Sequence, residues 1–352
     1  MVTFAFTLSC SRTPAPPKVD ESDIADFVGN EACRSCHAKE FEALHDTYHQ
    51  RSLRHMNREA LGDQIPPSGK INDTQYALVE QDKQFFFEVN PPDPAQHQLW
   101  PLDLIFGSGK FGMSFASLLE GKNIVEMKMS YFPQWHKWGI TPGQKMEGPA
   151  AAGNMGNLMQ SRKCIGCHSI AMSKNTFKPR DEFFGVGCES CHGAGKAHIK
   201  AVEAGEPDKR MVKFKAGRAR DLNTMCGKCH LTEKDVAPSS SMSKMTNRFQ
   251  PYGLMKSRCF LEGGEKISCS TCHDPHTNAS RDTLSYNRAC LSCHSATSKL
   301  SATVAAGKTC PVNATANCTS CHMPKRDLIG DLNLTSGVMF SDHRIAIYPG
   351  KR

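Results

Sequence analysis

The sequence predicts a mostly irregular and α-helical fold organised by covalently bound groups, with a small antiparallel β module in its N-terminal half. Only 39% of the 352 residues are apolar, below the about 45–50% that soluble domains usually have. Seventeen cysteines are far above ordinary usage, and fourteen of them belong to one recurring pattern, C-x-x-C-H. A chain of this length with so little apolar material needs bound groups to complete its core.

The pattern occurs seven times, and we number the copies motif 1 to motif 7 in chain order. Chance expects roughly 0.03 copies in a chain of this composition. The cysteine pairs are Cys33 and Cys36, Cys164 and Cys167, Cys188 and Cys191, Cys226 and Cys229, Cys269 and Cys272, Cys290 and Cys293, and Cys318 and Cys321. The histidines that follow them are His37, His168, His192, His230, His273, His294 and His322.

This residue order has the chemistry of haem c attachment. Two cysteines form thioether bonds to the two haem vinyl groups, and two intervening residues set the separation that those vinyls need. The histidine that follows then falls under the iron as its proximal ligand. A zinc or dithiol site would not require a histidine after every second cysteine. The sequence therefore predicts seven covalently bound haem c groups and a multihaem cytochrome c fold.

Eight further histidines are candidates for the distal ligands of these irons. They are His45, His49, His55, His97, His136, His198, His276 and His343. Seven haems need at most seven of them, so the supply permits bis-histidine ligation everywhere. It also permits one or two irons with an open position or a methionine ligand.

The local sequence ranks some of these candidates. Pro275 stiffens the step between His273 and His276, so we expect His276 to point at a neighbouring haem. His45 lies one helical turn before His49 on the same face, so these two compete for one site.

The net charge of +8 does not indicate nucleic acid as a partner. Each haem brings two propionates, so the holoprotein would carry about +1 when oxidised and about −6 when fully reduced. Many Lys and Arg side chains are expected to neutralise propionates. An RNP-like segment and zinc-finger spacing are both absent from the sequence, so we expect no nucleic-acid partner.

The motifs divide the chain into four parts. Residues 1–28 form an export or lipoprotein signal remnant with a Pro-rich tether, and residues 29–57 form the first haem-binding segment. Residues 58–150 form a haem-free, β-containing module, and residues 151–352 form a six-haem domain.

Hydrophobic patterns fill in this outline. Residues 76–79 and 85–89 flank residues 81–83 as a predicted hairpin. Residues 124–132 alternate between apolar and polar side chains, which predicts a half-buried strand. In the six-haem domain we expect short helices such as 195–204, none longer than about a dozen residues.

The N-terminal residues predict export. Residues 1–9 are mostly apolar but too short to span a membrane, and they resemble the tail of an export signal. Cys10 and a Pro-rich stretch follow, an order that predicts lipidation of Cys10. The alternative is a buried cysteine in a cleaved signal. Covalent haem attachment in bacteria happens outside the cytoplasm, so we expect an exported, membrane-anchored lipoprotein in the periplasm or at the cell surface.

Cys259 and Cys310 belong to no motif. They lie ten and eight residues before the starts of motifs 5 and 7. An oxidising compartment favours a disulfide between them, and the alternative is two separate thiols.

Several segments resemble multihaem cytochromes related to the cytochrome c554 family, in particular a seven-haem group often fused to tetratricopeptide repeats. The C-terminal segments are the most specific, and the resemblance covers most of residues 29–345. The shared segments are 107–109, 130–132, Trp138, 142–143, 187–193, His198, 259–260, 268–276, 318–325 and 342–343.

The resemblance implies stacked and T-shaped haem pairs at close range, with mostly bis-histidine ligation. It implies ligand roles for His49, His198, His276 and His343, and pairing of the two leftover cysteines. The sequence departs from the family at Lys110, near which some relatives are expected to carry a histidine, and no tetratricopeptide pattern is present. One haem here would then use another ligand or have an open position.

Three functions are compatible with these features. An electron carrier would exchange electrons with other redox proteins, such as cytochromes and membrane quinol-linked or outer-membrane complexes. A reductase or oxidase of a small nitrogen or sulfur compound would need one open haem iron. A subunit of an extracellular cytochrome filament would self-assemble and could donate a histidine to its neighbour. The crowding of haems favours the carrier over an enzyme.

Overall fold

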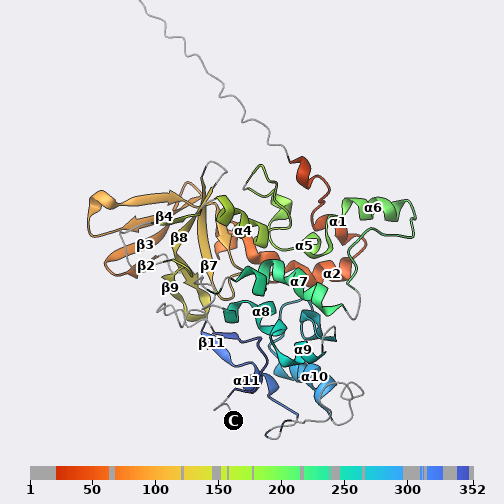
Figure 1. The fold of residues 1–352 in the computed structure, drawn as a ribbon. Helices are drawn as coiled ribbons and strands as arrows, with labels where there is room; N and C mark the ends of the chain where they lie inside the picture. The colour runs from red at the N-terminus through yellow and green to blue at the C-terminus, as the bar shows by residue number, and fades with distance from the viewer. Residues whose placement is uncertain are drawn as a thin grey trace, which may run out of the picture.

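The protein combines two antiparallel sheets on one side with a run of short helices on the other (Figure 1). This computed structural model describes residues 21–62, 68–119, 123–144, 152–156, 158–176, 178–214, 218–236, 238, 246–263, 266–295, 310, 312, 315–327 and 339–348. The structure contains both helices and antiparallel sheets, and the described strands that lie outside the predicted β module of residues 58–150 are β1 (Leu53–His55), β10 (Gly153–Met155), β11 (Lys325–Asp327) and β12 (Met339–Ser341). None of the helices in these ranges is both long enough and apolar enough to cross a membrane.

The helices are short, and the longest described ones have 12 residues. This length agrees with the prediction of elements no longer than about a dozen residues. The α-helices are α1 (Glu31–Arg34), α2 (Ala38–His45), α3 (Arg58–Leu61), α4 (Leu158–His168), α5 (Cys188–His192), α6 (Lys196–Glu203), α7 (Ala219–His230), α8 (Gln250–Met255), α9 (Arg258–Gly263), α10 (Thr283–His294) and α11 (Cys318–His322).

The strands of the N-terminal half form two sheets, and a third pair lies near the C-terminus. The described strands are β1 (Leu53–His55), β2 (Ser68–Ile71), β3 (Thr74–Gln81), β4 (Gln84–Asn90), β5 (Gln98–Pro101), β6 (Leu104–Phe106), β7 (Met113–Leu119), β8 (Asn123–Phe132), β9 (Lys137–Ile140), β10 (Gly153–Met155), β11 (Lys325–Asp327) and β12 (Met339–Ser341). One sheet has the order β2-β3-β4-β5, and the other has the order β1-β6-β7-β8-β10 with β9 also paired to β8. Strands β11 and β12 pair with each other.

The predicted hairpin is confirmed by β3 and β4, which pair from Gln75 with Asn90 to Gln81 with Gln84. Asp82 and Lys83 form its two-residue turn and both have positive φ, 50° and 68°. This is the backbone that a type I′ turn requires, and its twist matches that of the flanking strands.

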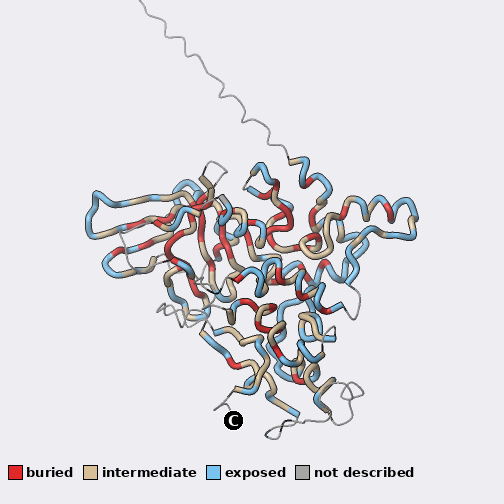
Figure 2. Tube along the Cα trace, viewed as in Figure 1, coloured by how far each residue is buried: buried red, intermediate tan, exposed pale blue. Residues whose placement is uncertain are grey.

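The two N-terminal sheets share one apolar core. Phe87 from β4 and Phe115 from β7 are fully buried in it, together with Met127 and Tyr131 from β8. Figure 2 shows buried residues concentrated in this part of the molecule, whereas the helical part is mostly intermediate or exposed. The short helices therefore contribute little apolar core of their own.

Strand β8 is buried on both faces, so the prediction of a half-buried strand is wrong. Lys128 is 7% exposed and Ser130 is 1% exposed, although both alternate with the apolar residues. The Ser130 hydroxyl shares hydrogen bonds with Ser114 and Thr141 hydroxyls, at 2.6 and 2.8 Å. The sequence alternates as in a half-buried strand, but neighbouring polar side chains satisfy the hydrogen bonds of its second face. That face can therefore be buried as well.

The opposite face of this sheet holds the helix that carries motif 2. Ile165, the residue between Cys164 and Gly166, is fully buried against Leu53, Leu104 and Ile124. Motif 2 is thereby fixed to the sheet through its own intervening residue.

Candidate metal centres

The seven motifs adopt helical turns, in two main arrangements. Motifs 2, 4 and 6 form the C-terminal ends of the longer helices α4, α7 and α10. Motifs 3 and 7 form short helices of their own, α5 and α11, and motif 5 starts with a 3-10 turn at Cys269–Thr271. One helical turn brings both cysteines and the histidine to the same face, as attachment to one side of a planar ring requires.

Motifs that are distant in sequence lie against one another at their cysteines. Side-chain interactions that shift thiol pKa values join Cys33 with Cys188, Cys167 with Cys229, Cys226 with Cys269, and Cys290 with Cys318, so these pairs are close in space. Electrostatic contacts also link Cys191 with Cys226 and Cys272 with Cys290. Every motif therefore lies close to at least one other motif.

Four motif histidines each face a second histidine ring from a distant part of the chain. The second ring is always one of the four distal candidates implied by the family resemblance. Ring centroids are 6.3 Å apart for His37 and His198, 6.0 Å for His230 and His49, 6.3 Å for His192 and His276, and 6.2 Å for His273 and His343.

These separations fit one iron between each pair of rings. A metal–nitrogen bond is about 2 Å long, and an imidazole nitrogen lies about 1.1 Å from its ring centre. Two imidazoles on opposite sides of one metal therefore have centroids about 6.2 Å apart. Since each pair includes the histidine of a C-x-x-C-H motif, the donor set fits a haem held between two imidazoles.

Hydrogen bonds fix the orientation of these rings. His198 donates its Nδ1 proton to Lys209 O at 2.7 Å, and His343 donates its Nδ1 proton to Ser341 O at 2.9 Å. A proton held on Nδ1 leaves Nε2 with a free lone pair, which is the form that binds a metal.

Burial keeps several of these imidazoles neutral. Desolvation lowers the pKa of His49, and the nearby His230 lowers it further. Desolvation likewise lowers the pKa of His192 and His273, and that of His343 to about 4. A neutral ring is required for metal ligation, so the electrostatics agree with the geometry.

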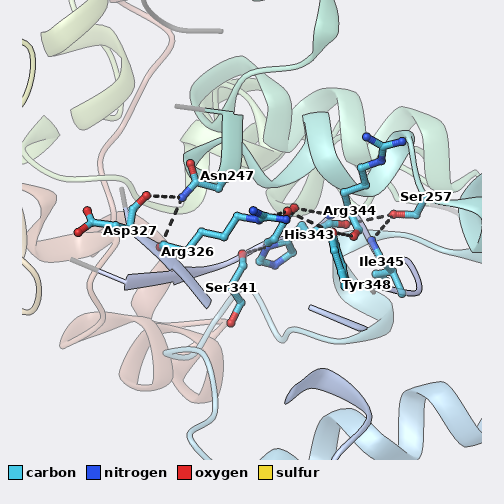
Figure 3. A network of polar contacts seen from close by, with 10 residues as sticks. Asn247, Ser257, Arg326, Asp327, Ser341, His343, Arg344, Ile345 and Tyr348 are labelled. Carbon is cyan, nitrogen blue, oxygen red and sulfur yellow. Dashed lines mark hydrogen bonds and ion pairs between the residues drawn. The ribbon is translucent and has the colours of Figure 1, made fainter. Parts of the chain in front are cut away.

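The segment that carries His343 is held by a polar network (Figure 3). Ser257 Oγ donates to His343 O at 3.1 Å and accepts from Ile345 N at 2.8 Å. Arg326 Nε donates to Asp342 Oδ2 at 2.8 Å from strand β11. These contacts hold the backbone on both sides of the histidine, so its ring direction is set by the fold.

A glycine in helix α8 lets the backbone of the His343 segment lie close to that helix. A Cβ atom on Gly253 of α8 would lie 2.7 Å from Arg344 N and 2.9 Å from the carbonyl carbon of His343. Both contacts are with backbone atoms, so neither could yield by turning a side chain. Sequence reasoning missed Gly253 because a helical glycine carries no signal of what it approaches.

Glu189 is a second residue that sequence reasoning missed. It lies inside motif 3 and is 2% exposed. Its carboxylate accepts hydrogen bonds from the amides of Val28, Gly29 and Gly195, at 2.7–3.1 Å. This one side chain therefore joins motif 3 to the backbone that leads into motif 1. An acidic residue between the motif cysteines was the available signal.

The other distal candidates have polar partners. His55 Nε2 lies 3.1 Å from Asp181 Oδ1, and His97 Nε2 lies 3.0 Å from Glu88 Oε1. His45 lies 3.5 Å from the carboxylate of its neighbour Asp46. His136 Nδ1 lies 3.4 Å from the Tyr131 hydroxyl. Of the two competing candidates near motif 1, His49 is the one that faces a motif histidine.

Three motif histidines have other surroundings. His168 Nδ1 donates to Ser52 O at 3.0 Å, and its ring meets that of Phe106 edge-on with centroids 5.3 Å apart. His322 Nδ1 donates to Ala346 O at 2.9 Å. His294 ends helix α10. Within the described ranges, no second imidazole faces any of these three rings.

The remaining sequence predictions are not tested by this geometry. Cys259 and Cys310 are each half-buried, burial raises the pKa of Cys259, and their pairing stays a prediction. Cys10, the predicted lipidation site, lies outside the described residues.

Two parts of the chain match known families. Residues 132–193 match the family model described as cytochrome c554 and c-prime, and residues 262–299 match the model of a doubled CXXCH motif. Cytochrome c-554 of Nitrosomonas europaea is 32% identical over 84 residues, which cover 20% of this chain and 36% of that protein. The chain thus spans little more than a third of the length of this curated relative.

Two solved structures are similar over most of the chain. Outer cell wall cytochrome OcwA is 15% identical with a TM-score of 0.49, covering 91% of this chain and 80% of that one. An undecahaem cytochrome from the S-layer of Carboxydothermus ferrireducens is 18% identical with a TM-score of 0.42, covering 89% and 52%.

We predict that His343→Ala converts one low-spin iron to a high-spin one that binds carbon monoxide when reduced, because the ring opposite His273 is removed. His97→Ala is the control, since His97 contacts Glu88 on a strand instead. Electron paramagnetic resonance and carbon monoxide difference spectra measure the change. A wholly low-spin His343→Ala protein would contradict the assignment.

We also predict that Gly253→Ala gives a partly high-spin signal at one iron, because the new methyl group must displace the backbone of His343. Overpacking of this kind costs about 1–3 kcal/mol. Gly62→Ala is the matched control, because Gly62 has φ +79° with open space around it and so loses stability through backbone strain alone. Equal spectra for the two variants would refute the role of Gly253.

Proposed function

We propose that the chain is a multihaem c-type cytochrome that binds seven haem c groups and passes electrons along them between redox partners, supported by its partial matches to cytochrome c554 and doubled CXXCH models. The observation that carries the proposal is the set of four opposed imidazole pairs, with centroids 6.0–6.3 Å apart. An iron with two protein ligands has no free position for a substrate, so its chemistry is electron exchange. Each step oxidises one ferrous haem and reduces its ferric neighbour.

The contacts between motif cysteines support an order for this relay. The cysteines of motifs 1 and 3, 3 and 4, 4 and 5, 5 and 6, and 6 and 7 act on one another electrostatically, so these motifs are neighbours in turn. Motif 2 contacts motif 4 through Cys167 and Cys229. The proposed route is therefore a line of six haems, 1-3-4-5-6-7, with haem 2 as a branch at haem 4. Haems 1, 2 and 7 are its three ends, where partners would deliver or accept electrons.

The axial ligands and surroundings would set the potential of each haem. Two imidazoles at haems 1, 3, 4 and 5 favour low potentials compared with a methionine ligand. The partners would be other redox proteins, such as cytochromes or membrane quinol-linked or outer-membrane complexes, docking through small transient interfaces.

A reductase or oxidase of a small nitrogen or sulfur compound is the second candidate. The observation in its favour is His168, whose ring meets Phe106 and faces no second imidazole within the described ranges. An iron there with an open sixth position could bind a substrate.

The haem count and both candidates are tested on the purified holoprotein. Pyridine haemochrome absorbance relative to protein is expected to give seven haems per chain, all reduced by dithionite and reoxidised by an electron acceptor. A measured value below seven haems per chain contradicts the proposed haem count. An unchanged spectrum with carbon monoxide excludes the enzyme. If one haem binds carbon monoxide, assays with nitrite, hydroxylamine and sulfite as substrates follow.

The proposal includes export and anchoring by a lipid on Cys10, supported by the order of residues in 1–28. Cys10→Ser is expected to move the haem-loaded protein from the membrane fraction to the soluble fraction, because the thiol is the acceptor of the lipid. Immunoblots of the two fractions measure the distribution. A variant that remains in the membrane fraction contradicts lipidation of this residue.

A further inference from the structure

Three asparagines repeat one contact between haem-attachment motifs. Asn30 Oδ1 accepts from the amide of Cys188 at 2.8 Å, and Asn223 Oδ1 accepts from the amide of Cys269 at 2.9 Å. Asn287 Oδ1 accepts from the amide of Cys318 at 3.1 Å. Each acceptor lies three residues before the first cysteine of one motif, and each donor is the first cysteine of another.

We propose that Asn30, Asn223 and Asn287 are positioning residues that lock the motifs into pairs, 1 with 3, 4 with 5 and 6 with 7. The haems bound to each pair are thereby held at a fixed spacing. This inference rests on the proposed function, since it concerns the spacing of the haems assigned there. It adds a division of the line of haems into three rigid units.

Helical geometry explains why the third residue before the cysteine can do this. Residues i and i+3 lie on one face of a helix, so the asparagine shares the face that carries the haem thioethers. In α7 this face includes Asn223, Cys226 and His230. The amide side chain is therefore directed toward the neighbouring motif instead of toward solvent.

The receiving motifs begin their helical turns at their own first cysteine. In motifs 3, 5 and 7 these residues are Cys188, Cys269 and Cys318. The first amides of a helical turn have no partner within it and need a cap. The asparagine of the partner motif supplies this cap from outside, which ties the start of one turn to the face of another.

Burial supports a structural purpose for these side chains. Asn223 is 0% exposed and Asn287 is 2% exposed, although asparagine is a poor helix former. In the first pair, Gly187 leaves room for Asn30, since a Cβ there would overlap the Oδ1 and Nδ2 atoms of Asn30.

Motif 2 provides the contrast. Its residue at the same position is Ser161, which is 1% exposed and accepts from Ile124 N of strand β8 at 3.2 Å. A polar side chain three residues before the first cysteine therefore fixes motif 2 to the sheet by accepting a backbone hydrogen bond. The corresponding residues of the receiving motifs are Gly185, Lys266 and Thr315.

The test compares Asn223→Ala, Asn223→Asp and Asn57→Ala in the full haem-loaded chain. Asn57 caps α3 through Ala60 N at 2.8 Å, so its alanine variant reports the loss of a cap elsewhere. Hydrogen exchange of the Cys269 amide and the Soret circular dichroism couplet of closely spaced haems are the two readouts. The haem count of each variant separates this proposal from the proposed function.

Asn223→Ala is expected to speed exchange at Cys269 by about tenfold and to remove the couplet contribution of one pair, with seven haems retained. Asn223→Asp keeps the acceptor oxygen and should retain both signals, and Asn57→Ala should change neither. If Asn223→Ala folds poorly, Asn287→Ala with exchange at Cys318 serves instead. Unchanged exchange at the receiving cysteine, or an unchanged couplet, overturns the proposal.

Discussion

The distance between opposed imidazole rings is the constraint on which the helical part of the molecule depends. Two rings whose centroids are about 6 Å apart do not contact each other, so other parts of the folded chain must hold each ring in place. It does so with carbonyl acceptors at Nδ1 and with polar networks such as the one around His343. The pairs also join distant segments, since His37 faces His198 and His273 faces His343. Metal ligation at these sites would cross-link the chain where apolar packing is thin.

The two halves of the molecule are consequently built on different principles. The sheets are held by an apolar core in which Phe87, Phe115 and Met127 are fully buried. The helical half depends on individually placed polar contacts, of which the Glu189 carboxylate is the clearest case. Motif 2 belongs to both halves, because Ile165 packs on the sheet while Cys167 contacts motif 4. The sheet can therefore act as a fixed base for the first of the six clustered motifs.

Features that depend on local sequence could be predicted, and features that depend on long-range contacts could not. The β3–β4 hairpin and the short helix at Lys196–Glu203 follow from patterns within a dozen residues. The attachment motifs are equally local. The partner of each histidine is not, because His49 and His230 lie 181 positions apart and nothing in either segment specifies the other. The burial of Lys128 also depended on distant strands.

The segments around His49 and Pro275 bring two of the candidate centres together, and the Pro275 carbonyl offsets part of the lowering of the His49 pKa by burial. His49 faces His230, and His276, the residue after Pro275, faces His192. Tyr48 N donates to Asn278 Oδ1 at 2.8 Å, so a hydrogen bond joins the two segments beside the rings. A change in charge at one iron would act on the other ring through these joined segments. Thermodynamic reciprocity then requires the second centre to act back on the first, so their midpoint potentials would be linked rather than independent.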